Sequence, residues 1–325
     1  MSTVADVTLA LLLVVAAMGV LATAVERDGT GHDPLTAAYT AETIAAGTMN
    51  VTYDVERAIT EYGRLGDGNA DIDYTDEELE RLAHGPIAAH AAALAVLNLE
   101  FDLDTLRNGS GRGTVALSAE AADYERTVDE KLRTRLVASS FDTQVIAVWE
   151  PLADGPLRGT AELGQTPPPD VDVSATTITV PVDVPSARRD ALDEVADPAD
   201  FDVVATAVAG AVIEGYFPET RSQRALESAG VRHDLTAYRY RQMAAALATE
   251  TNDIEAAVEP VLERRTANAT AANAALKRAL ARQLEASLEP EDSTVRPAAG
   301  PLGNATAAAA RISTGTVTIT VRTWH

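Results

Sequence analysis

The sequence predicts an α+β protein in which a single N-terminal transmembrane helix is followed by a helix-rich ectodomain. The ectodomain is expected to contain a mixed or antiparallel sheet closed by the C-terminal strand. Three observations carry this prediction: residues 7–25 have no charge, helical patterns dominate the middle of the chain, and residues 315–324 alternate between polar and apolar side chains. Strands at both ends of a helical middle are typical of α+β folds.

The first element is the apolar stretch from Val7 to Val25, which contains nineteen residues. A helix of that length spans about 28 Å, close to the hydrocarbon thickness of a bilayer. Two alternatives remain. Ala22-Thr23-Ala24 has the pattern of a signal-peptidase site, and an all-apolar helix is also compatible with the core of a soluble protein. An uncleaved anchor is favoured because no Lys or Arg precedes the stretch.

The domain organisation follows from this stretch. Residues 1–27 form the membrane anchor or signal segment, and residues 28–34 form a hinge because they contain two glycines and a proline. Residues 35–325 form an extracytoplasmic α+β domain. A second interpretation divides this domain into two lobes joined near residues 164–170, where three consecutive prolines make the chain stiff and extended.

In the first part of the domain, periodicity and capping residues predict four elements. They are a helix from Asp33 to Gly47, a strand from Met49 to Val55, a helical turn or two from Glu56 to Tyr62, and a helix from Asp76 to Leu99 that is broken at Gly85-Pro86.

The second part is predicted to alternate between strands and helices before the last strand. The expected elements are a helix from Ser118 to Ala138, strands at Thr143–Trp149, Arg158–Leu163 and Val171–Val184 with a bulge near Thr176, helices at Asp200–Gly215, His233–Ala248 and Ile254–Leu288 with a kink at Pro260, and a strand at Gly315–Trp324 with Val317, Ile319 and Val321 facing inward.

The composition indicates the salt concentration in which the protein works more than it indicates a binding partner. The chain has 49 acidic and 26 basic residues, a net charge of −23, and only two lysines. Acidic, lysine-poor chains resemble haloarchaeal proteins, which stay soluble in molar salt because their self-repulsion is screened there. No basic stripe is present to neutralise phosphates, so nucleic acid is not an expected partner. Without cysteine the chain has no disulfides, thiolate nucleophiles or Cys-ligated zinc.

Four Asn-x-Ser/Thr sequons support an external location. They use half of the eight asparagines, whereas about one match is expected by chance. The alternative is that threonine is simply abundant in this chain. The predicted glycosylation sites are Asn50, Asn108, Asn268 and Asn304.

One acidic loop is a weak candidate for a calcium site. Counting from Asp67, its oxygen-bearing side chains fall at positions one, three, five, seven and twelve of an EF-hand-like loop. The sixth position should be glycine but is Ile72, which weakens the match. The favoured alternative is a solvated turn in which Thr75 and Glu78 form a capping box for the next helix. The candidate ligands are Asp67, Asn69, Asp71, Asp73 and Glu78.

Other chemistry lacks a sequence signal. HExxH, GxSxG, phosphate-binding and dinucleotide-binding motifs do not occur. His90 stands among alanines and is expected to be a hydrogen-bonded core histidine rather than a ligand. We therefore predict no catalytic residues, no cofactor and no enzymatic activity.

Several segments in this order resemble one protein family. They are AETIAAGTMNVTYDV, LERLAHGPIAAHAAALAVLNL, QVIAVWEPLADGPLRG before the prolines, SATTITVP, GYFPETRSQRAL, RYRQMA and GTVTITVRTW. The chain is similar to an uncharacterised haloarchaeal family of single-pass surface proteins, often encoded near type IV pilus or Tad-like secretion components. The resemblance implies a location and a set of neighbours, but no activity and no catalytic residues.

The expected function is therefore that of a membrane-anchored extracytoplasmic protein acting through protein contacts, as an accessory component of a pilus-like or secretion assembly. Its expected partners are the bilayer, through Val7 to Val25, and pilus or secretion components. A filament subunit is not favoured, because the anchor lacks a Lys/Arg-Gly processing site and residues 29–34 interrupt the helix. The alternative is an exported enzyme or ligand-binding protein with a calcium-stabilised fold.

Overall fold

The computed structural model describes residues 34–65, 74–101, 121–136, 141–249, 253–288 and 304–325. The predicted anchor, Val7 to Val25, lies outside these ranges. The described chain combines helices with two antiparallel sheets, which confirms the α+β class.

Within the described ranges no single helix is long and apolar enough to span a bilayer. Only one pair of helices, Phe201–Tyr216 with Glu219–Glu227, meets the criteria of length and composition, and this pair is bent by 44°.

The larger sheet has five strands in the order β3-β5-β4-β7-β6, and every neighbouring pair is antiparallel. Its strands are β3 (Leu99–Phe101), β4 (Asp142–Trp149), β5 (Leu157–Gly164), β6 (Ser174–Pro181) and β7 (Thr316–Trp324). The C-terminal strand does not lie at the edge of the sheet but between β4 and β6. The register of β6 on β7 is continuous through Thr176, so the predicted bulge there is wrong.

The predicted alternation of β7 is confirmed. Val317, Ile319 and Val321 are fully buried, whereas the threonines between them face the other side. This period of two places every second side chain in the core. Residues 164–170, where the two-lobe interpretation places its junction, connect β5 to β6 of this one sheet.

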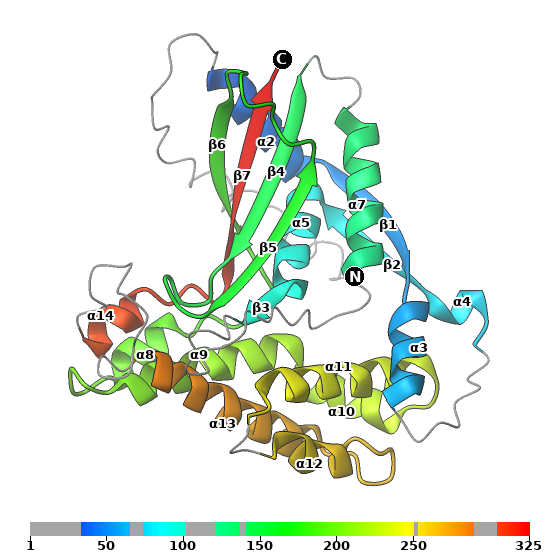
Figure 1. The fold of residues 1–325 in the computed structure, drawn as a ribbon, viewed down its shortest axis with the longest axis vertical. Helices are drawn as coiled ribbons and strands as arrows, with labels where there is room; N and C mark the ends of the chain where they lie inside the picture. The colour runs from blue at the N-terminus through cyan, green and yellow to red at the C-terminus, as the bar shows by residue number, and fades with distance from the viewer. Residues whose placement is uncertain (1–33, 66–73, 102–120, 137–140, 250–252, 289–303) are drawn as a thin grey trace, which may run out of the picture.

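One face of the sheet, here called the inner face, is covered by three helices. These are α2 (Pro34–Ala46), α5 (Ile87–Leu97) and α7 (Ala121–Leu136); in Figure 1, α2 and α5 pass behind the strands and α7 stands beside them. The helix α5 is apolar on nearly every side because it lies between the sheet and its neighbouring helices. The helix α2 ends where expected, since the backbone N–H of Gly47 donates to the carbonyl oxygen of Thr43 at 2.8 Å.

A two-stranded ribbon extends from this side of the molecule. It pairs β1 (Thr48–Asp54) with β2 (Glu80–Pro86) and continues into α3 (Glu56–Leu65) and α4 (Asp76–Leu79), and we call these four elements the arm (Figure 1). The single helix predicted from Asp76 to Leu99 is wrong in its first half. There the chain pairs with β1, because the antiparallel ladder satisfies the backbone groups of both strands at once.

The C-terminal half forms a helical lobe across one end of the sheet (Figure 1). The predicted helix from Ile254 to Leu288 is divided after Val258, because Pro260 cannot continue an α-helix and a turn follows it. The helices are α8 (Arg188–Glu194), α9 (Phe201–Tyr216), α10 (Glu219–Glu227), α11 (Val231–Leu247), α12 (Ile254–Val258), the 3-10 turn η1 (Glu259–Val261), α13 (Ala269–Leu288) and α14 (Ala305–Ala310).

The sheet and the helical lobe share one hydrophobic core. A single cluster of buried side chains includes Val145 and Ile319 of the sheet together with Val208 and Leu276 of α9 and α13. The hydroxyl of Tyr216 on α9 donates to the carbonyl oxygen of Val96 in α5, which ties the two parts together at their junction. Burial raises the pKa of this phenol, so it stays protonated as a donor.

Candidate functional site

The predicted calcium loop is only partly visible. Asp67, Asn69, Asp71 and Asp73 lie outside the described residues. Glu78 is described, and its Oε2 accepts hydrogen bonds from the backbone N–H and the hydroxyl of Thr75 at 3.0 and 3.1 Å. The backbone bond contributes most to lowering the pKa of Glu78. The capping pair is therefore confirmed, and among the described residues no group of three His, Asp or Glu side chains is placed to hold a metal ion.

The three described sequon asparagines all have local structural roles. Oδ1 of Asn268 accepts from the backbone N–H of Ala271, and Oδ1 of Asn304 accepts from that of Ala307, each at 2.9 Å. Both residues are thus helix N-caps, for α13 and α14. A glycan is attached through Nδ2, so these bonds leave the attachment atom available. Asn108 lies outside the described residues, and glycosylation stays a prediction.

The third sequon asparagine, Asn50, is exposed on β1 opposite His84 of β2. Its Oδ1 lies 2.5 Å from Nδ1 of His84, so the imidazole donates this cross-strand bond. The pair lies on the solvent side of the arm and strengthens the ribbon where the sequence favoured helix over strand.

His90 is a core histidine, as predicted, and its side chain is only 4% exposed. Nε2 lies 3.2 Å from the carbonyl oxygen of Met49, which can only accept, so Nε2 carries the proton. Nδ1 then accepts from the hydroxyl of Tyr124 at 2.6 Å. This contact joins α5, α7 and β1 inside the core. Burial is the main cause that lowers the pKa of His90 below its usual value near 6.5.

This lowered pKa predicts a pH-dependent stability. Above pH 6.5 the contribution of neutral His90 to the free energy of unfolding is fully present. As the pH falls below 6.5, the imidazole takes up a proton in the unfolded chain but not in the folded protein, so the folded state loses stability. This loss continues until the pH reaches the lower pKa of His90 in the folded state. The slope is at most about 1.4 kcal/mol per pH unit. Denaturant unfolding of the native chain and of His90→Gln at several pH values between neutral and mildly acidic will measure it.

The control for this prediction is His84→Gln, which removes an exposed imidazole from the neighbouring strand β2. We expect His84→Gln to retain the acid-dependent loss and His90→Gln to lose most of it. An unchanged slope in His90→Gln would show that other groups cause the dependence.

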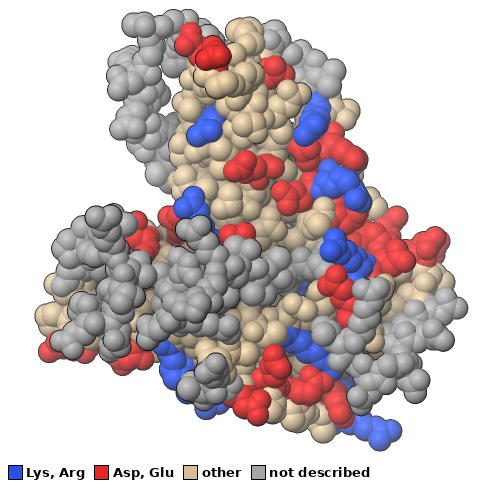
Figure 2. Space-filling model, in the orientation of Figure 1, with Lys and Arg blue, Asp and Glu red and all other residues tan. Residues whose placement is uncertain are grey.

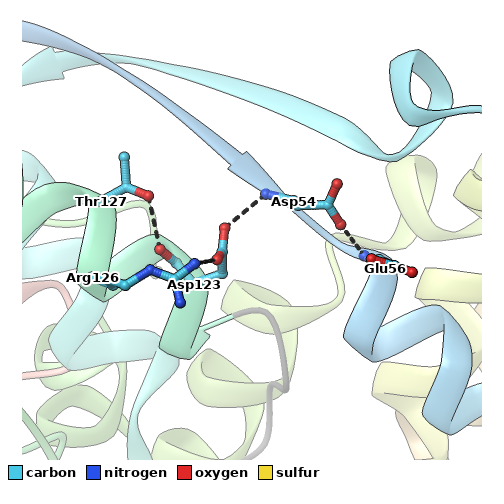
Figure 3. Close-up of polar contacts among 5 residues, drawn as sticks. All are labelled: Asp54, Glu56, Asp123, Arg126 and Thr127. Atoms are coloured by element: carbon cyan, nitrogen blue, oxygen red, sulfur yellow. Dashed lines mark hydrogen bonds and ion pairs between the residues drawn. The ribbon is translucent and has the colours of Figure 1, made fainter.

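A polar joint fixes the far end of β1, where α3 begins, to α7 (Figure 3). Oδ2 of Asp123 accepts from the backbone N–H of Asp54 at 2.9 Å, and its Oδ1 pairs with Arg126. Oδ1 of Asp54 in turn accepts from the backbone N–H of Glu56 where α3 begins, and Thr127 donates to the carbonyl oxygen of Asp123 at 3.0 Å. Three of these contacts bind a backbone group, and the fourth is an ion pair between Asp123 and Arg126 on one helix, so the cluster is structural.

The tip of the arm docks on α11. The hydroxyl of Tyr74 donates to Oδ2 of Asp234 at 2.7 Å, and that of Tyr238 donates to Oε2 of Glu61 at 2.8 Å. A small separate core surrounds these bonds, formed by Val55, Ala58, Ile59, Leu79, Val231, Leu235 and Tyr238. The arm therefore links the sheet side of the molecule to the helical lobe.

A shallow hollow of about 530 Å³ lies on the helical lobe. His233 is its one imidazole, and Nδ1 donates to the carbonyl oxygen of Leu226 at 2.8 Å, so Nε2 of the neutral ring is an acceptor. The other lining residues are Glu227, Glu263, Arg264 and Arg265, all exposed. Two acids and two bases in open solvent are screened from one another, and the hollow lacks the water exclusion that catalytic sites use.

The sequence analysis missed the arm, its joint at Asp123 and this hollow. Each depends on residues far apart in the chain, such as Asp54 with Asp123 or Glu227 with Glu263. Of these features, only the contact between Asp54 and Glu56 has a local signal in the sequence. An Asp side chain just before a helix often accepts a hydrogen bond from a backbone N–H of the first turn.

The comparisons with known proteins support the resemblance in its general form. No curated protein and no solved structure gives a significant match to the chain. A sequence profile for a family of unknown function, DUF7284, matches residues 5–324, nearly the whole chain. The protein therefore belongs to the DUF7284 family, whose function is unknown.

Proposed function

We propose that this protein is a membrane-anchored extracytoplasmic protein of a haloarchaeon that acts through protein contacts, as an accessory component of a pilus-like or secretion assembly. The observation that carries the proposal is the uncharged stretch from Val7 to Val25, followed by an acidic domain with almost no lysine. The stretch lies inside the region that the DUF7284 profile matches, so it belongs to the shared part of the family.

The described domain supports action by contact rather than by catalysis. Its buried polar side chains serve the fold: His90 bonds to Tyr124 and Met49, and Asp234 bonds to Tyr74. The hollow at His233 is open and shallow. An external location is supported by Asn50, Asn268 and Asn304, whose side chains reach the surface.

The anchor predicts that two arginines in the apolar stretch release the protein. At the centre of a membrane helix each Arg costs about 2.5–3.5 kcal/mol, so Val15→Arg with Ala16→Arg should prevent insertion. We expect the native chain to sediment with membranes and to require detergent for extraction, and the double variant to leave the membrane fraction. The matched control is Ser2→Arg with Thr3→Arg, which adds the same charge before the stretch and should stay in the membrane.

Orientation is tested by external protease on intact and lysed cells. We expect the domain to be digested in both. Digestion only after lysis would place the domain inside the cell and overturn the proposed location.

Deletion of the gene, with imaging of surface filaments and a measurement of adhesion, tests the assembly role. Unchanged filaments and adhesion would reject that part of the proposal.

A further inference from the structure

The helix α2 has one side that no other described element covers. Its exposed residues recur along that side, and we call them the free side of α2: Ala38, Tyr39, Glu42, Thr43 and Ala46. The opposite side packs on the inner face of the sheet through Ala37, Ala41 and Ile44. Tyr39 is 74% exposed, more than any other large hydrophobic side chain in the described part of the chain.

The free side carries almost no charge, although its residues are exposed. Glu42 is the single charged residue among the 13 of α2, whereas α7, which covers the same face of the sheet, has eight charged residues among 16. Figure 2 shows how densely red and blue side chains gather around the arm and the helical lobe. A helix without a charged side is typical of one that is covered all round. The composition of α2 therefore predicts that its free side is covered too.

The position of α2 in the chain brings a bilayer within its reach. It is the first described element after the anchor, and only eight residues separate Val25 from Pro34. Even when fully extended, a chain of that length spans about 30 Å. In Figure 1, α2 begins at the end of the sheet that lies away from the helical lobe. The anchor therefore holds this end of the domain next to the membrane in every copy of the chain.

We infer that the free side of α2 lies against the lipid headgroups, with the ring of Tyr39 at the border between headgroups and hydrocarbon. Tyrosine is enriched at this border, because its ring is apolar and its hydroxyl stays in water. The short tether selects the bilayer over a separate protein: it keeps lipid at a high effective concentration beside α2, whereas a protein must reach the same surface by diffusion. The inference rests on the anchor of the proposed function, and it adds the surface by which the domain contacts the membrane.

This contact orients the domain. The helical lobe lies at the other end of the sheet, because β6 leads into α8 and β7 follows α14. The lobe therefore points away from the bilayer, and Asn268 and Asn304, which cap α13 and α14, stay accessible from outside. Leu192 on α8 is also an exposed apolar residue of a helix, but it lies in the lobe and should stay in water.

The test uses the absence of cysteine, which lets single cysteines carry an environment-sensitive fluorophore. Tyr39→Cys and the matched control Leu192→Cys are made in the full chain and inserted into vesicles of phosphatidylcholine and phosphatidylglycerol. Nitroxide on the lipid acyl chains quenches a label in the membrane, and iodide quenches a label in water. We expect the label at position 39 to be quenched by nitroxide and shielded from iodide, because an interfacial helix lies about 5–10 Å into the boundary between headgroups and acyl chains. The label at position 192 should show the reverse.

A second set of variants tests the ring itself, with the label on Thr43→Cys one turn further along the free side. Tyr39→Glu keeps a good helix former but adds a charge, so it should return this label to water. Tyr39→Trp keeps an interfacial aromatic ring and should leave the label in the lipid. Circular dichroism verifies that each variant is folded.

Two results would overturn the inference alone. One is a label at position 39 that iodide quenches as strongly as the label at position 192. The other is a label shielded from both quenchers, which would mean that protein covers the free side of α2. A chain that does not float with the vesicles would overturn the anchor, and the inference with it, so flotation of the same samples separates the two failures.

Discussion

Replacing Gly159 by alanine is expected to destabilise the fold by about 3 kcal/mol or more, since overpacking against a backbone that cannot move lies at the upper end of such costs. An added Cβ at Gly159 would lie 1.9 Å from the carbonyl oxygen of Ala95 and 3.0 Å from its carbonyl carbon. Gly159 is held between Leu99 and Trp149 in the sheet, and Ala95 belongs to the buried helix α5. Neither element can retreat without opening the core. Urea unfolding will measure the loss.

The control is Gly85→Ala in β2. A Cβ there would have its nearest contact at 3.9 Å, with Nε2 of His90, which is an ordinary van der Waals distance. Because alanine restricts the unfolded chain more than glycine does, this change should be neutral or stabilise by about 0.4–1 kcal/mol. Equal losses at the two positions would contradict the close approach of α5 to β5.

Local patterns were sufficient for much of the fold. The strands β4 and β7 and the helices α9 and α11 occur close to their predicted ranges, because each has a long, regular hydrophobic pattern. The order of the strands in the sheet could not be predicted from local patterns. The placement of β7 between β4 and β6 depends on strand pairs more than 130 residues apart, such as Thr179 with Thr318, and no local pattern encodes them.

The errors have specific physical causes. Residues 80–84 were predicted as part of the helix that the Thr75 and Glu78 capping box opens and Gly85-Pro86 breaks, but pairing with β1 outweighs a helix preference of a few tenths of a kcal/mol per residue. We predicted one long helix from Ile254 with a kink at Pro260. Instead the helical segment ends at the 3-10 turn that contains Pro260, and α13 begins at Ala269 with Asn268 as its N-cap.

The polar residues show how one pattern can have two meanings. Asn268 and Asn304 were selected as sequons, yet the same Asn-x-Thr spacing also places an N-cap before an alanine-rich helix. The N-cap role is observed and glycosylation stays a prediction; the two are compatible, since the cap uses Oδ1 and a glycan would use Nδ2. His90 was assigned correctly because its neighbours are apolar, but its partner Tyr124 is 34 residues away and was not predictable.

Replacing Trp149 by alanine is expected to be the second severe change, with a loss of about 3–5 kcal/mol for a fully buried aromatic residue. The indole N–H donates to the carbonyl oxygen of Thr314 at 2.9 Å, and the hydroxyl of Thr314 donates to Pro185 and accepts from the backbone N–H of Ala187. Trp149 also packs toward Tyr216 of α9, with ring centroids 6.4 Å apart. It therefore connects the end of the sheet to the helical lobe.

Trp149→Phe separates the ring from the hydrogen bond. It keeps an aromatic side chain but leaves the carbonyl oxygen of Thr314 without its donor, so we expect an intermediate loss of about 1–3 kcal/mol. Trp149→Ala also leaves Trp324 as the single tryptophan, a fluorescent reporter in the sheet, while far-ultraviolet circular dichroism reports mainly the helices. Because one core cluster extends through both parts, the two signals should change together during unfolding. Separate transitions in this variant would mean that the shared core alone does not couple the sheet to the helical lobe, and that the side chain of Trp149 is needed to make them unfold together.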